Sequence, residues 1–416
     1  MARQSHHIGI DIGSSQVRIV VAQQELEQEN ITVRGAGAAE MQGMQKGVIT
    51  DIDEADKSVD RSLDSEERVV GSPVEQAYVS VNGSHIGSQN SRGVIAVSRA
   101  DGEITPEDVD PVINAAQAIS LPANREILHV LPQNFIVDGQ EHVQDPIGMT
   151  GVRLEVETHV IDGSAPFVKN LTKVINQSGV HIEDFVFAPL AAATAVLEKR
   201  QKELGVVLID IGAGTTTLAV YEEKSLLHTA VLPVGSSHIT NDIAIGLRTS
   251  IDVAEELKVQ HGTALPEEIK ANDSVVIEDS AVSGDEGKQT VSRKEIAEIT
   301  AARLDEIFSF VDKELKQLGR SGLLPAGAVI TGGGAQLPGV VEVAKNRLRL
   351  PARVGVPQKF DGIVDQAQGP QFAVALGLIA WATEQESRMS GRSAIRVPHV
   401  GQTVSNVRDW FKTFLP

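Results

Sequence analysis

The chain has 416 residues, a formal net charge of −19 and no cysteine, and 41% of its residues are hydrophobic against 22% charged. This length and composition indicate a soluble globular protein of two or more domains. The absence of cysteine excludes disulfides and thiolate metal sites and fits a reducing cytosol. The negative charge argues against any nucleic-acid partner. No run approaches the ~20 apolar residues of a membrane-spanning helix, and none near the N-terminus has the length of a signal peptide.

Two segments roughly 200 residues apart share one pattern. Residues 8–15 and 207–216 each read as an apolar strand followed by Asp, Ile, Gly and small or hydroxyl side chains, and a second strand-like run follows each. This spacing is too long for a solenoid repeat. It predicts two related α/β domains that face a shared cleft.

Residues 84–166, between these segments, read as a separate inserted unit. Strand-like runs at 92–97 and 127–137 flank a helical segment at 106–119, which has Pro at its start. We therefore expect a small α/β insert within the first half of the chain.

Further helices are expected at 167–177 and at 188–197, the second of which is rich in Ala. A second subdomain is expected at 248–316. It contains an acidic loop at 272–288 and then an amphipathic helix at 294–315. The apolar side chains of that helix predicted to face a core are Ile296, Ile299, Leu304, Ile307 and Val311.

A small-residue helix is predicted at 371–378, and a Ser-, Gly- and Arg-rich tether at 387–403. The segment 404–416 contains one of the two Trp residues and reads as an amphipathic helix. Its apolar stripe includes Val407, Trp410, Phe411, Phe414 and Leu415, and its cations are Arg408 and Lys412. This pattern is typical of a helix that lies in a membrane interface. The alternative is a clamp on the protein's own body.

The two Asp-Ile-Gly turns are candidate phosphate sites, because tight turns with Gly and hydroxyl residues bring backbone N–H groups close to phosphates. Asp11 and Asp210 would then act on Mg²⁺ through its water shell, since a carboxylate does not bind phosphate directly. A Gly turn between buried strands is the alternative for a single copy, and the duplication argues against it. The predicted phosphate-binding residues are Gly13, Ser14, Ser15, Gly212, Gly214, Thr215 and Thr216.

Three consecutive glycines, Gly332, Gly333 and Gly334, follow an apolar run at 328–330. They permit close backbone approach to a flat ligand such as adenine or ribose. A mobile loop is the alternative. The position of the glycines after a strand favours the ligand site.

These motifs together resemble a known superfamily. Five segments resemble the five signatures of the actin-like ATPases: residues 11–14, 188–192, 210–215, 331–334 and 373–377. Within that superfamily the chain resembles the FtsA family of bacterial cell-division proteins. Five further segments carry this resemblance: 47–51, 131–138, 145–154, 239–244 and 254–258.

The resemblance implies an α/β fold, namely an actin-like duplicated ribonuclease-H-type fold with an FtsA-type inserted subdomain and a C-terminal amphipathic helix. The implied boundaries are 1–83, 167–198 and 377–386 for subdomain IA, 84–166 for the inserted subdomain IC, 199–247 and 317–376 for subdomain IIA, 248–316 for subdomain IIB, 387–403 for a flexible linker, and 404–416 for a membrane-targeting helix.

The resemblance also implies ATP and Mg²⁺ as cofactors. By match to the motifs, Asp11 and Asp210 would order Mg²⁺ through water, and Glu255 and Lys258 would reach the adenosine. Gly333 and Gly334 would pass beneath the base. Without the resemblance, Glu255 and Lys258 read as a solvated ion pair one helical turn apart, worth ~0.2–0.5 kcal/mol.

The chain departs from the wider superfamily at Ala188. Several hydrolysing members carry Glu immediately before the Pro of this helix, and Ala188 has no proton acceptor. Water-orienting groups commonly supply about 10²–10⁴-fold in rate. We therefore expect tight ATP binding with at most slow ATPase activity, with Asp210 as a possible substitute orienter.

The implied function is a cell-division protein that self-assembles on the inner face of the cytoplasmic membrane at the septum. Its implied partners are the FtsZ C-terminal peptide, divisome membrane proteins, membrane lipids and other copies of itself. Arg303 and Glu306 are candidate contacts for the FtsZ peptide, although a solvated helix face is the plainer interpretation. A related pilus-assembly adaptor ATPase and an actin-fold small-molecule kinase are the alternatives.

Overall fold

A computed structural model describes residues 4–25, 31–70, 73–278, 288–358, 360–362 and 367–390. The expected helix at 404–416 lies outside these residues, as does the tether beyond Ser390. None of the described helices is long and apolar enough to cross a membrane.

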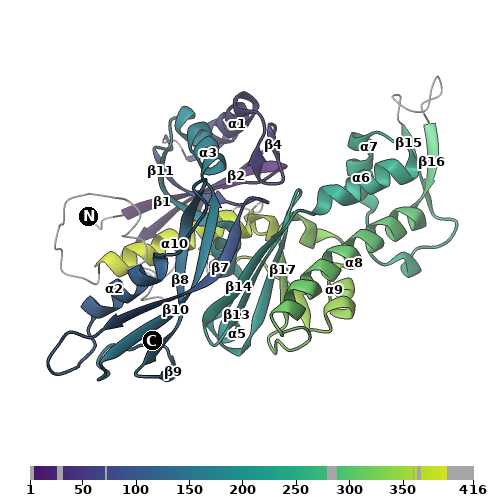
Figure 1. The fold of residues 1–416 in the computed structure, drawn as a ribbon. Coiled ribbons are helices and arrows are strands. Elements are labelled where there is room, and N and C mark those ends of the chain that lie inside the picture. The colour runs from purple at the N-terminus through teal and green to yellow at the C-terminus, as the bar shows by residue number, and fades with distance from the viewer. Residues whose placement is uncertain are drawn as a thin grey trace.

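Two sheets that share the same order of five strands form the body of the molecule, and the first has one further strand at its edge (Figure 1). We call them and their covering helices lobe I and lobe II. The lobe I sheet runs β11 (His181–Phe187), β6 (Gln76–Val81), β1 (Gln4–Ile12), β2 (Gln16–Glu25), β3 (Ile31–Glu40) and β19 (Phe360–Asp361). The lobe II sheet runs β18 (Ala352–Val354), β17 (Ala328–Thr331), β12 (Val206–Ile211), β13 (Thr216–Glu222) and β14 (Ser225–Leu232).

The duplication predicted from the sequence is confirmed in the strand pairing. In each lobe an antiparallel hairpin, β1–β2 or β12–β13, carries the Asp-Ile-Gly turn. The first strand of each hairpin also pairs in parallel with a strand later in the chain, β6 or β17. The carboxyl ends of these parallel strands therefore meet at one edge, where ligands of α/β folds bind.

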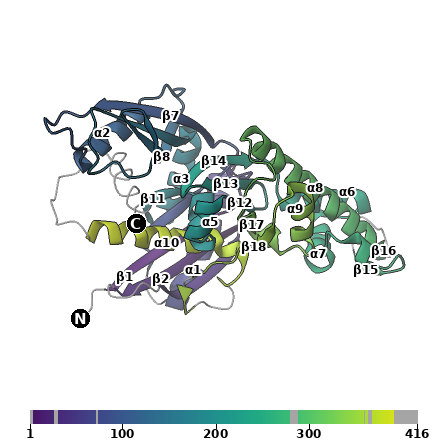
Figure 2. The same cartoon turned by 90° about the horizontal axis from the view of Figure 1, so that it is seen from below.

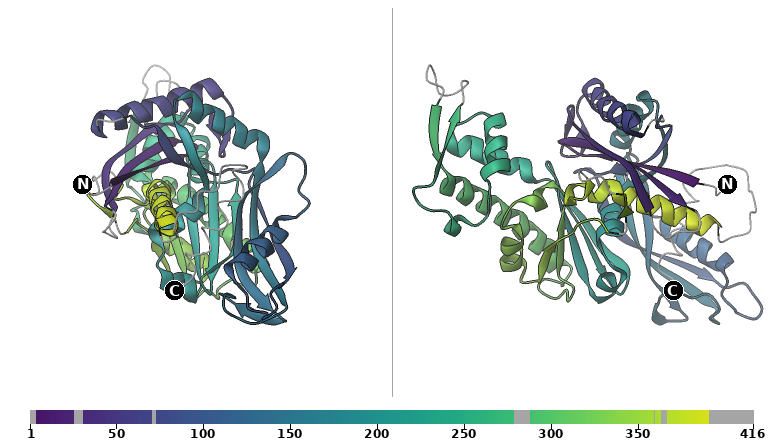
Figure 3. Two further views of the ribbon diagram at one scale, coloured as in Figure 1. Left: turned by 90° about the vertical axis from the view of Figure 1, so that its left-hand side faces the viewer. Right: turned by 180° about the vertical axis from the view of Figure 1, so that it is seen from behind.

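Helices fill the space between the two sheets and cover their outer faces. α10 (Ala373–Ser390) packs on β1, β2 and β6, and α4 (Ala188–Val196) packs on β12 and β13. α1 (Ile52–Val70) and α3 (Ala165–Gln177) cover the far side of the lobe I sheet. The end-on view in Figure 3 shows α10 enclosed between lobes. α10 continues to Ser390, so residues 387–390 of the expected tether are helical. Arg388 and Met389 have high helix propensity, which favours this extension of the helix.

α4 and α10 cross closely because small residues line both. A Cβ at Gly377 would overlap the carbonyl oxygen of Ala191. Thr194 on α4 also donates its hydroxyl to the Gly377 carbonyl, at 3.1 Å. The Ala-rich run and the small-residue helix noted in the sequence are thus two halves of one contact.

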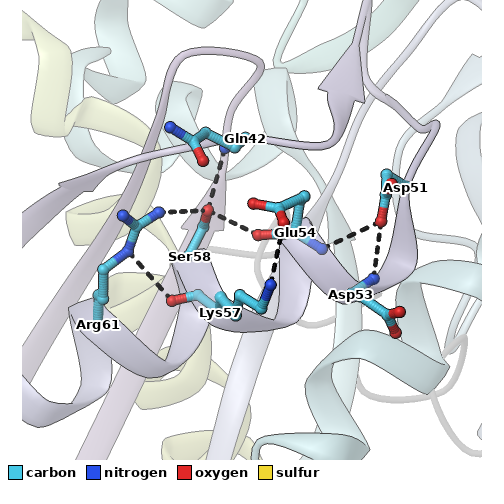
Figure 4. A network of polar contacts seen from close by, with 7 residues as sticks. All are labelled: Gln42, Asp51, Asp53, Glu54, Lys57, Ser58 and Arg61. Atoms are coloured by element: carbon cyan, nitrogen blue, oxygen red, sulfur yellow. Dashed lines mark hydrogen bonds and ion pairs between the residues drawn. The ribbon is translucent and has the colours of Figure 1, made fainter.

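A short hairpin and a capped helix follow β3. The hairpin consists of β4 (Met44–Gln45) and β5 (Val48–Ile49). Asp51 Oδ1 then accepts hydrogen bonds from the backbone N–H groups of Asp53 and Glu54, at 3.0 and 3.1 Å, which caps α1. Figure 4 shows how Ser58 extends this network, since its Oγ accepts from Gln42 N at 3.0 Å. The hairpin and α1 are therefore held as one unit.

The insert is an α/β layer with its own core. Its sheet runs β7 (Gly87–Ala96), β10 (Arg153–Ser164), β8 (Arg125–Val137) and β9 (Gln140–Val143), and α2 (Pro106–Gln117) covers it. The strands and the helix predicted at 92–97, 127–137 and 106–119 are present.

The insert contacts both lobes. In lobe I, Phe187 N donates to His129 Nε2 at 3.0 Å. In lobe II, Gln133 Nε2 donates to the carbonyl oxygen of Leu226 at 2.8 Å, and a 2.9 Å hydrogen bond joins His159 Nε2 and Thr229 Oγ1. Figure 2 shows β7 and β8 of the insert beside β14. The insert thus bridges the lobes.

The remainder of lobe II is mainly helical, with one hairpin. Its elements are α5 (Lys199–Leu204), α6 (Ser236–Leu247), α7 (Ile251–His261), η1 (Pro266–Glu268), β15 (Ser274–Glu278), β16 (Lys288–Ser292), α8 (Arg293–Gln317), η3 (Gly333–Gln336), α9 (Val340–Leu348) and η5 (Pro370–Phe372). Four of the five apolar side chains predicted to face a core from α8 are fully buried, and Ile299 is partly buried.

The prediction of a loop over 272–288 was wrong in part. Residues 274–278 form β15, which pairs with β16 in an antiparallel hairpin. Val275 and Ile277 pack against the core of lobe II while Val276 is exposed, so the alternation of a half-buried strand is present. The acidic residues beyond it obscured this short signal.

Candidate nucleotide site

A cleft opens between the two lobes, at the carboxyl ends of the parallel strands. It is lined by predicted nucleotide-binding residues from both halves of the chain. These are Asp11, Gly13, Ser14, Ser15, Asp210, Gly212, Gly214, Thr215, Gly332 and Gly333. The folding of the two repeats therefore brings both phosphate turns and the first part of the triple-glycine segment together.

The two phosphate turns have the same geometry. Gly13 N donates to Gln16 O at 3.0 Å, and Gly212 N donates to Thr215 O at 2.9 Å. A Cβ at either glycine would lie 3.0 Å from that same carbonyl oxygen. Each turn thus leaves room for backbone only, which suits close approach to a phosphate chain.

The turns also touch each other across the cleft. A Cβ at Gly214 would lie 2.8 Å from Ser14 Oγ and 3.0 Å from the backbone of Lys46. Ser14 Oγ in turn accepts a 3.0 Å hydrogen bond from Gly47 N. The lobes therefore meet at Ser14, Gly214 and the tip of the β4–β5 hairpin.

Asp11 lies buried at the end of β1 between two partners. Ser80 Oγ donates to Asp11 Oδ1 at 2.8 Å, and Arg18 Nη1 lies 3.9 Å from Asp11 Oδ2. Burial raises the pKa of the Asp11 carboxyl, and the Arg18 charge and the Ser80 hydrogen bond oppose that rise. Ser80 and Arg18 therefore fix the position of the Asp11 carboxylate.

Asp210 is the counterpart in lobe II, and its surroundings are less favourable to charge. Burial and the nearby Asp11 carboxylate raise the pKa of Asp210 to about 7, and Arg18 opposes the rise. Two carboxylates and one cation therefore face the same cleft. Such a pair suits Mg²⁺, which is usually held by one or two carboxylates together with phosphate oxygens.

The triple-glycine segment lies beneath Asp210. Gly332 has a φ of +82°, and a Cβ there would overlap Asp210 Oδ1. Gly332 N donates to Pro370 O at 3.1 Å, so the segment is anchored to η5. Gly334 is buried against Ile211 and does not line the cleft.

Thr216, Glu255 and Lys258 also lie outside the cleft lining. Thr216 is fully buried in β13. Lys258 is 7% exposed, and its Nζ donates to Glu255 Oε2 at 2.6 Å and to Thr240 Oγ1 at 2.9 Å. The pair is therefore half-buried beneath α6 and not fully solvated. Lys258 Nζ also lies 3.5 Å from the carbonyl oxygen of Ser236, which lines the cleft.

Ala188 lines the cleft at the first residue of α4. Its methyl group supplies no proton acceptor where the helix begins. The helix N-terminus still presents backbone N–H groups and the positive end of the helix dipole, which favour a phosphate.

Several lining residues were not identified from the sequence, among them Arg18, Gly47, Asn82, Ser236 and Gln371. Arg18 could have been predicted from the local sequence, because it lies opposite Asp11 in the short β1–β2 hairpin. Gly47 and Asn82 come from loops, Ser236 begins α6 and Gln371 lies in η5, and the positions of all four depend on tertiary packing.

The chemistry of this donor set fits ATP with Mg²⁺. The two glycine turns make a cradle that a Cβ would narrow, two carboxylates face it, and the Arg18 Nε atom is buried without a hydrogen-bond partner among the described residues. When bound, Mg²⁺ would neutralise phosphate charge between Asp11 and Asp210.

Arg303 and Glu306 lie on α8, away from the cleft. Arg303 makes a two-pronged contact with Asp242 of α6, at 2.6 and 2.8 Å, and a further contact with Glu306. Arg303 is therefore held in an ion-pair network that ties α6 to α8. Whether it also contacts a partner stays a prediction.

Comparison with known proteins assigns the family. The profile of the family described as "Cell division protein FtsA" matches residues 207–377, and that of the "SHS2 domain inserted in FTSA" matches residues 83–162. The chain is 41% identical to the cell division protein FtsA of Bacillus subtilis over 93% of this chain and 85% of that protein. It is 36% identical to that of Pseudomonas aeruginosa over 91% and 90%, and 31% identical to that of Escherichia coli over 97% of each.

Solved structures support the fold. A PilM–PilN type IV pilus biogenesis complex matches with a TM-score of 0.65 at 15% identity, over 90% of this chain and 98% of that chain. MreB5 of Spiroplasma citri bound to ADP matches with a TM-score of 0.56 at 13% identity, over 93% and 99%. These likenesses show an actin-like fold alone, whereas the sequence relatives decide against the pilus-adaptor and kinase alternatives. The chain belongs to the FtsA family of cell division proteins.

Proposed function

We propose that this chain is an ATP- and Mg²⁺-binding cell-division protein that polymerises on the inner face of the cytoplasmic membrane at the septum. There it anchors FtsZ and recruits later divisome membrane proteins. The observation that carries the proposal is the cleft between duplicated lobes, into which each lobe contributes one glycine turn and one aspartate. Membership of the FtsA family supports the role in division.

In this proposal the backbone N–H groups of the two turns, with the Ser14, Ser15 and Thr215 hydroxyls, hold the phosphates. Asp11 and Asp210 orient the water shell of Mg²⁺, and Arg18 balances their charge. A phosphate chain between the lobes would bind both turns at once, which favours a closed cleft.

The adenosine lies toward α7 and the triple-glycine segment in the same proposal. Glu255 is the more exposed member of the Glu255–Lys258 pair, with a side chain that is 49% exposed, so it is the one able to meet a ribose hydroxyl. Lys258 would orient Glu255 through their 2.6 Å contact. A Cβ at Gly333 would meet no atom within 4 Å, so this position leaves open space for the base.

ATP turnover is expected to be slow because Ala188 cannot orient a water molecule. The nucleotide then acts mainly as a clamp on the lobes. A turnover number of about 1–10³ s⁻¹, as in ordinary enzymes, that disappears in Asp210→Ala would contradict this expectation.

Membrane binding is assigned to the segment 404–416, on its sequence alone. A short amphipathic helix binds weakly, because ordering the helix costs much of the free energy gained by burying its apolar face. Head-to-tail assembly of closed protomers gives an open filament. Many such segments on one filament then bind the membrane together by avidity.

FtsZ docking is assigned to the subdomain of α6, α7 and α8, with Arg303 and Glu306 as contacts. Arg303 uses its Nε and Nη2 groups on Asp242 and its Nη1 group on Glu306, and two further guanidinium N–H groups remain for a carboxylate of the partner.

The proposal is tested by co-sedimentation with anionic liposomes, with and without ATP and Mg²⁺. The full chain is compared with a chain ending at Gln402 and with Trp410→Asp. Thr413→Asp, which adds the same charge outside the apolar stripe, is the matched control. We expect tail-dependent binding that strengthens with ATP and is lost in Trp410→Asp. Equal partitioning of the full and shortened chains would exclude the membrane role.

A further inference from the structure

Ser80, on β6, makes two hydrogen bonds at the first phosphate turn. Its Oγ donates to Asp11 Oδ1 at 2.8 Å and accepts from Ile12 N at 3.0 Å. Ser80 is 1% exposed, so water does not compete for either bond. Because both bonds fix the hydroxyl group, the Asp11 carboxylate has one oxygen held and one oxygen, Oδ2, directed toward Arg18.

The second phosphate turn lacks this arrangement, although the strands are duplicated. The position equivalent to Ser80 is Thr331 on β17, which is in register with Asp210. Thr331 Oγ1 instead lies 3.0 Å from Pro370 O and 3.2 Å from Gly355 O, and donates toward these carbonyls. Among the described residues no side-chain hydrogen bond reaches the Asp210 carboxylate. The two aspartates of the cleft are therefore not equivalent.

We propose that Ser80 is a positioning residue for Mg²⁺ in this site, which fixes the orientation of the Asp11 carboxylate and leaves Asp210 as the adjustable member of the pair. The inference rests on the proposed ATP–Mg²⁺ function. It follows from geometry, since a metal-shell ligand is effective only when its own orientation is held. Removing a partner that orients such a ligand typically costs about 10–100-fold in metal affinity.

Ser80 also supports the backbone of Ile12, so a general loss of binding would not identify its role. The informative quantity is the Mg²⁺-dependent gain, the ratio of ATP affinity in Mg²⁺ to ATP affinity in EDTA. Loosening of the turn backbone would lower both affinities together. Loss of the Asp11 orientation would lower the ratio.

The experiment is isothermal titration of the full chain with ATP, in Mg²⁺ and in EDTA. We expect Ser80→Ala to reduce the Mg²⁺-dependent gain about 10-fold, and Ser80→Thr, which keeps the hydroxyl group, to retain it. Ser62→Ala is the matched control, because Ser62 is also fully buried but its hydroxyl has no hydrogen-bond partner among the described residues. In an Asp11→Asn background, Ser80→Ala should reduce the gain no further.

Two outcomes would overturn the inference: an unchanged ratio in Ser80→Ala, including an equal loss of affinity in Mg²⁺ and EDTA, or a full additive loss in the Asp11→Asn background. If the added methyl group of Ser80→Thr prevents folding, Ser80→Cys replaces it, since its thiol is a weak donor and should retain only part of the gain. A wild-type chain with no Mg²⁺-dependent gain would instead contradict the proposed ATP–Mg²⁺ site itself.

Discussion

Arg18 faces Asp11 across the β1–β2 hairpin, with its Nη1 atom 3.9 Å from Asp11 Oδ2. Burial and Asp11 raise the pKa of Asp210 in the opposite lobe, and the same guanidinium opposes that rise. Burial in turn lowers the pKa of Arg18, and the two aspartates oppose that shift. One cation on lobe I therefore balances a carboxylate from each half of the duplicated fold.

Replacing Arg18 with Gln should weaken ATP–Mg²⁺ binding by about 10–100-fold, since a hydrogen bond to a charged group contributes roughly 1.5–3 kcal/mol. Without the cation the pKa of both aspartates rises, so the variant should also recover affinity as the pH increases above 7. Isothermal titration at two pH values measures both effects. Arg18→Lys keeps the charge and should lose less. Equal affinity of Arg18→Gln and the wild type would show that Arg18 does not act on the bound nucleotide.

The carboxyl group of Glu66, on α1, is buried, and one of its oxygens lacks a hydrogen-bond partner among the described residues. Glu66 is 1% exposed, its Oε1 lies against Gly37 of β3, and its Oε2 has no hydrogen-bond partner among the described residues. Burial raises the pKa of Glu66 from the usual 4.5 to about 7. Between these values the folded chain holds a proton that the unfolded chain releases. The free energy of unfolding therefore falls as the pH rises toward 7, and this loss is constant above 7.

Glu66→Gln should accordingly raise the free energy of unfolding at pH 8 by roughly 1–3 kcal/mol, with no gain near pH 4. Chemical denaturation at both pH values measures the difference. Asp64→Asn on the exposed face of the same helix is the matched control and should have little effect. A gain that is the same at both pH values would mean that the carboxylate charge is not its cause.

Gly377→Ala should destabilise the protein by about 1–3 kcal/mol, the usual cost of overpacking. The added methyl group would overlap the Ala191 carbonyl oxygen where α10 crosses α4. Gly246→Ala on α6 is the control, since its methyl group would meet only the end of the Ile299 side chain, at 2.8 Å. Denaturant unfolding of both variants measures the difference in their midpoints. Equal midpoints would contradict the close crossing of α4 and α10.

Arg303→Glu should reduce binding of the FtsZ C-terminal peptide at least 10-fold if α8 carries the docking site, because it reverses the charge at the proposed contact. Arg347→Glu, which breaks the comparable Arg347–Asp305 ion pair between α9 and α8, is the control. Fluorescence anisotropy with a labelled peptide gives both affinities. Equal losses in the two variants would point to the net charge of the subdomain as the cause.

The parts of this fold that depend on local sequence were predictable. The phosphate turns repeat a short pattern, and α8 shows its helical period over many residues, so Ile296 and Leu304 could be placed in a core. β15 was not predictable, because five residues before an acidic run carry little periodic signal. Ser80 and Asn82 were missed because they reach the site through the parallel pairing of β6 with β1, which joins residues almost 70 positions apart. Lys258 was expected to be solvated in the absence of a family resemblance, and packing beneath α6 buries it instead.

The insert is bonded to lobe I through His129 and to lobe II through Gln133 and His159. Any rotation that narrows the cleft must change at least one of these contacts, so the insert and the nucleotide share one conformational equilibrium. Thermodynamic linkage then acts in both directions. A protein that binds the insert more tightly when the cleft is closed raises the affinity of the cleft for nucleotide by a certain factor, and nucleotide raises the affinity of the insert for that protein by the same factor. We therefore expect a partner bound to the insert to change the affinity of the cleft for nucleotide.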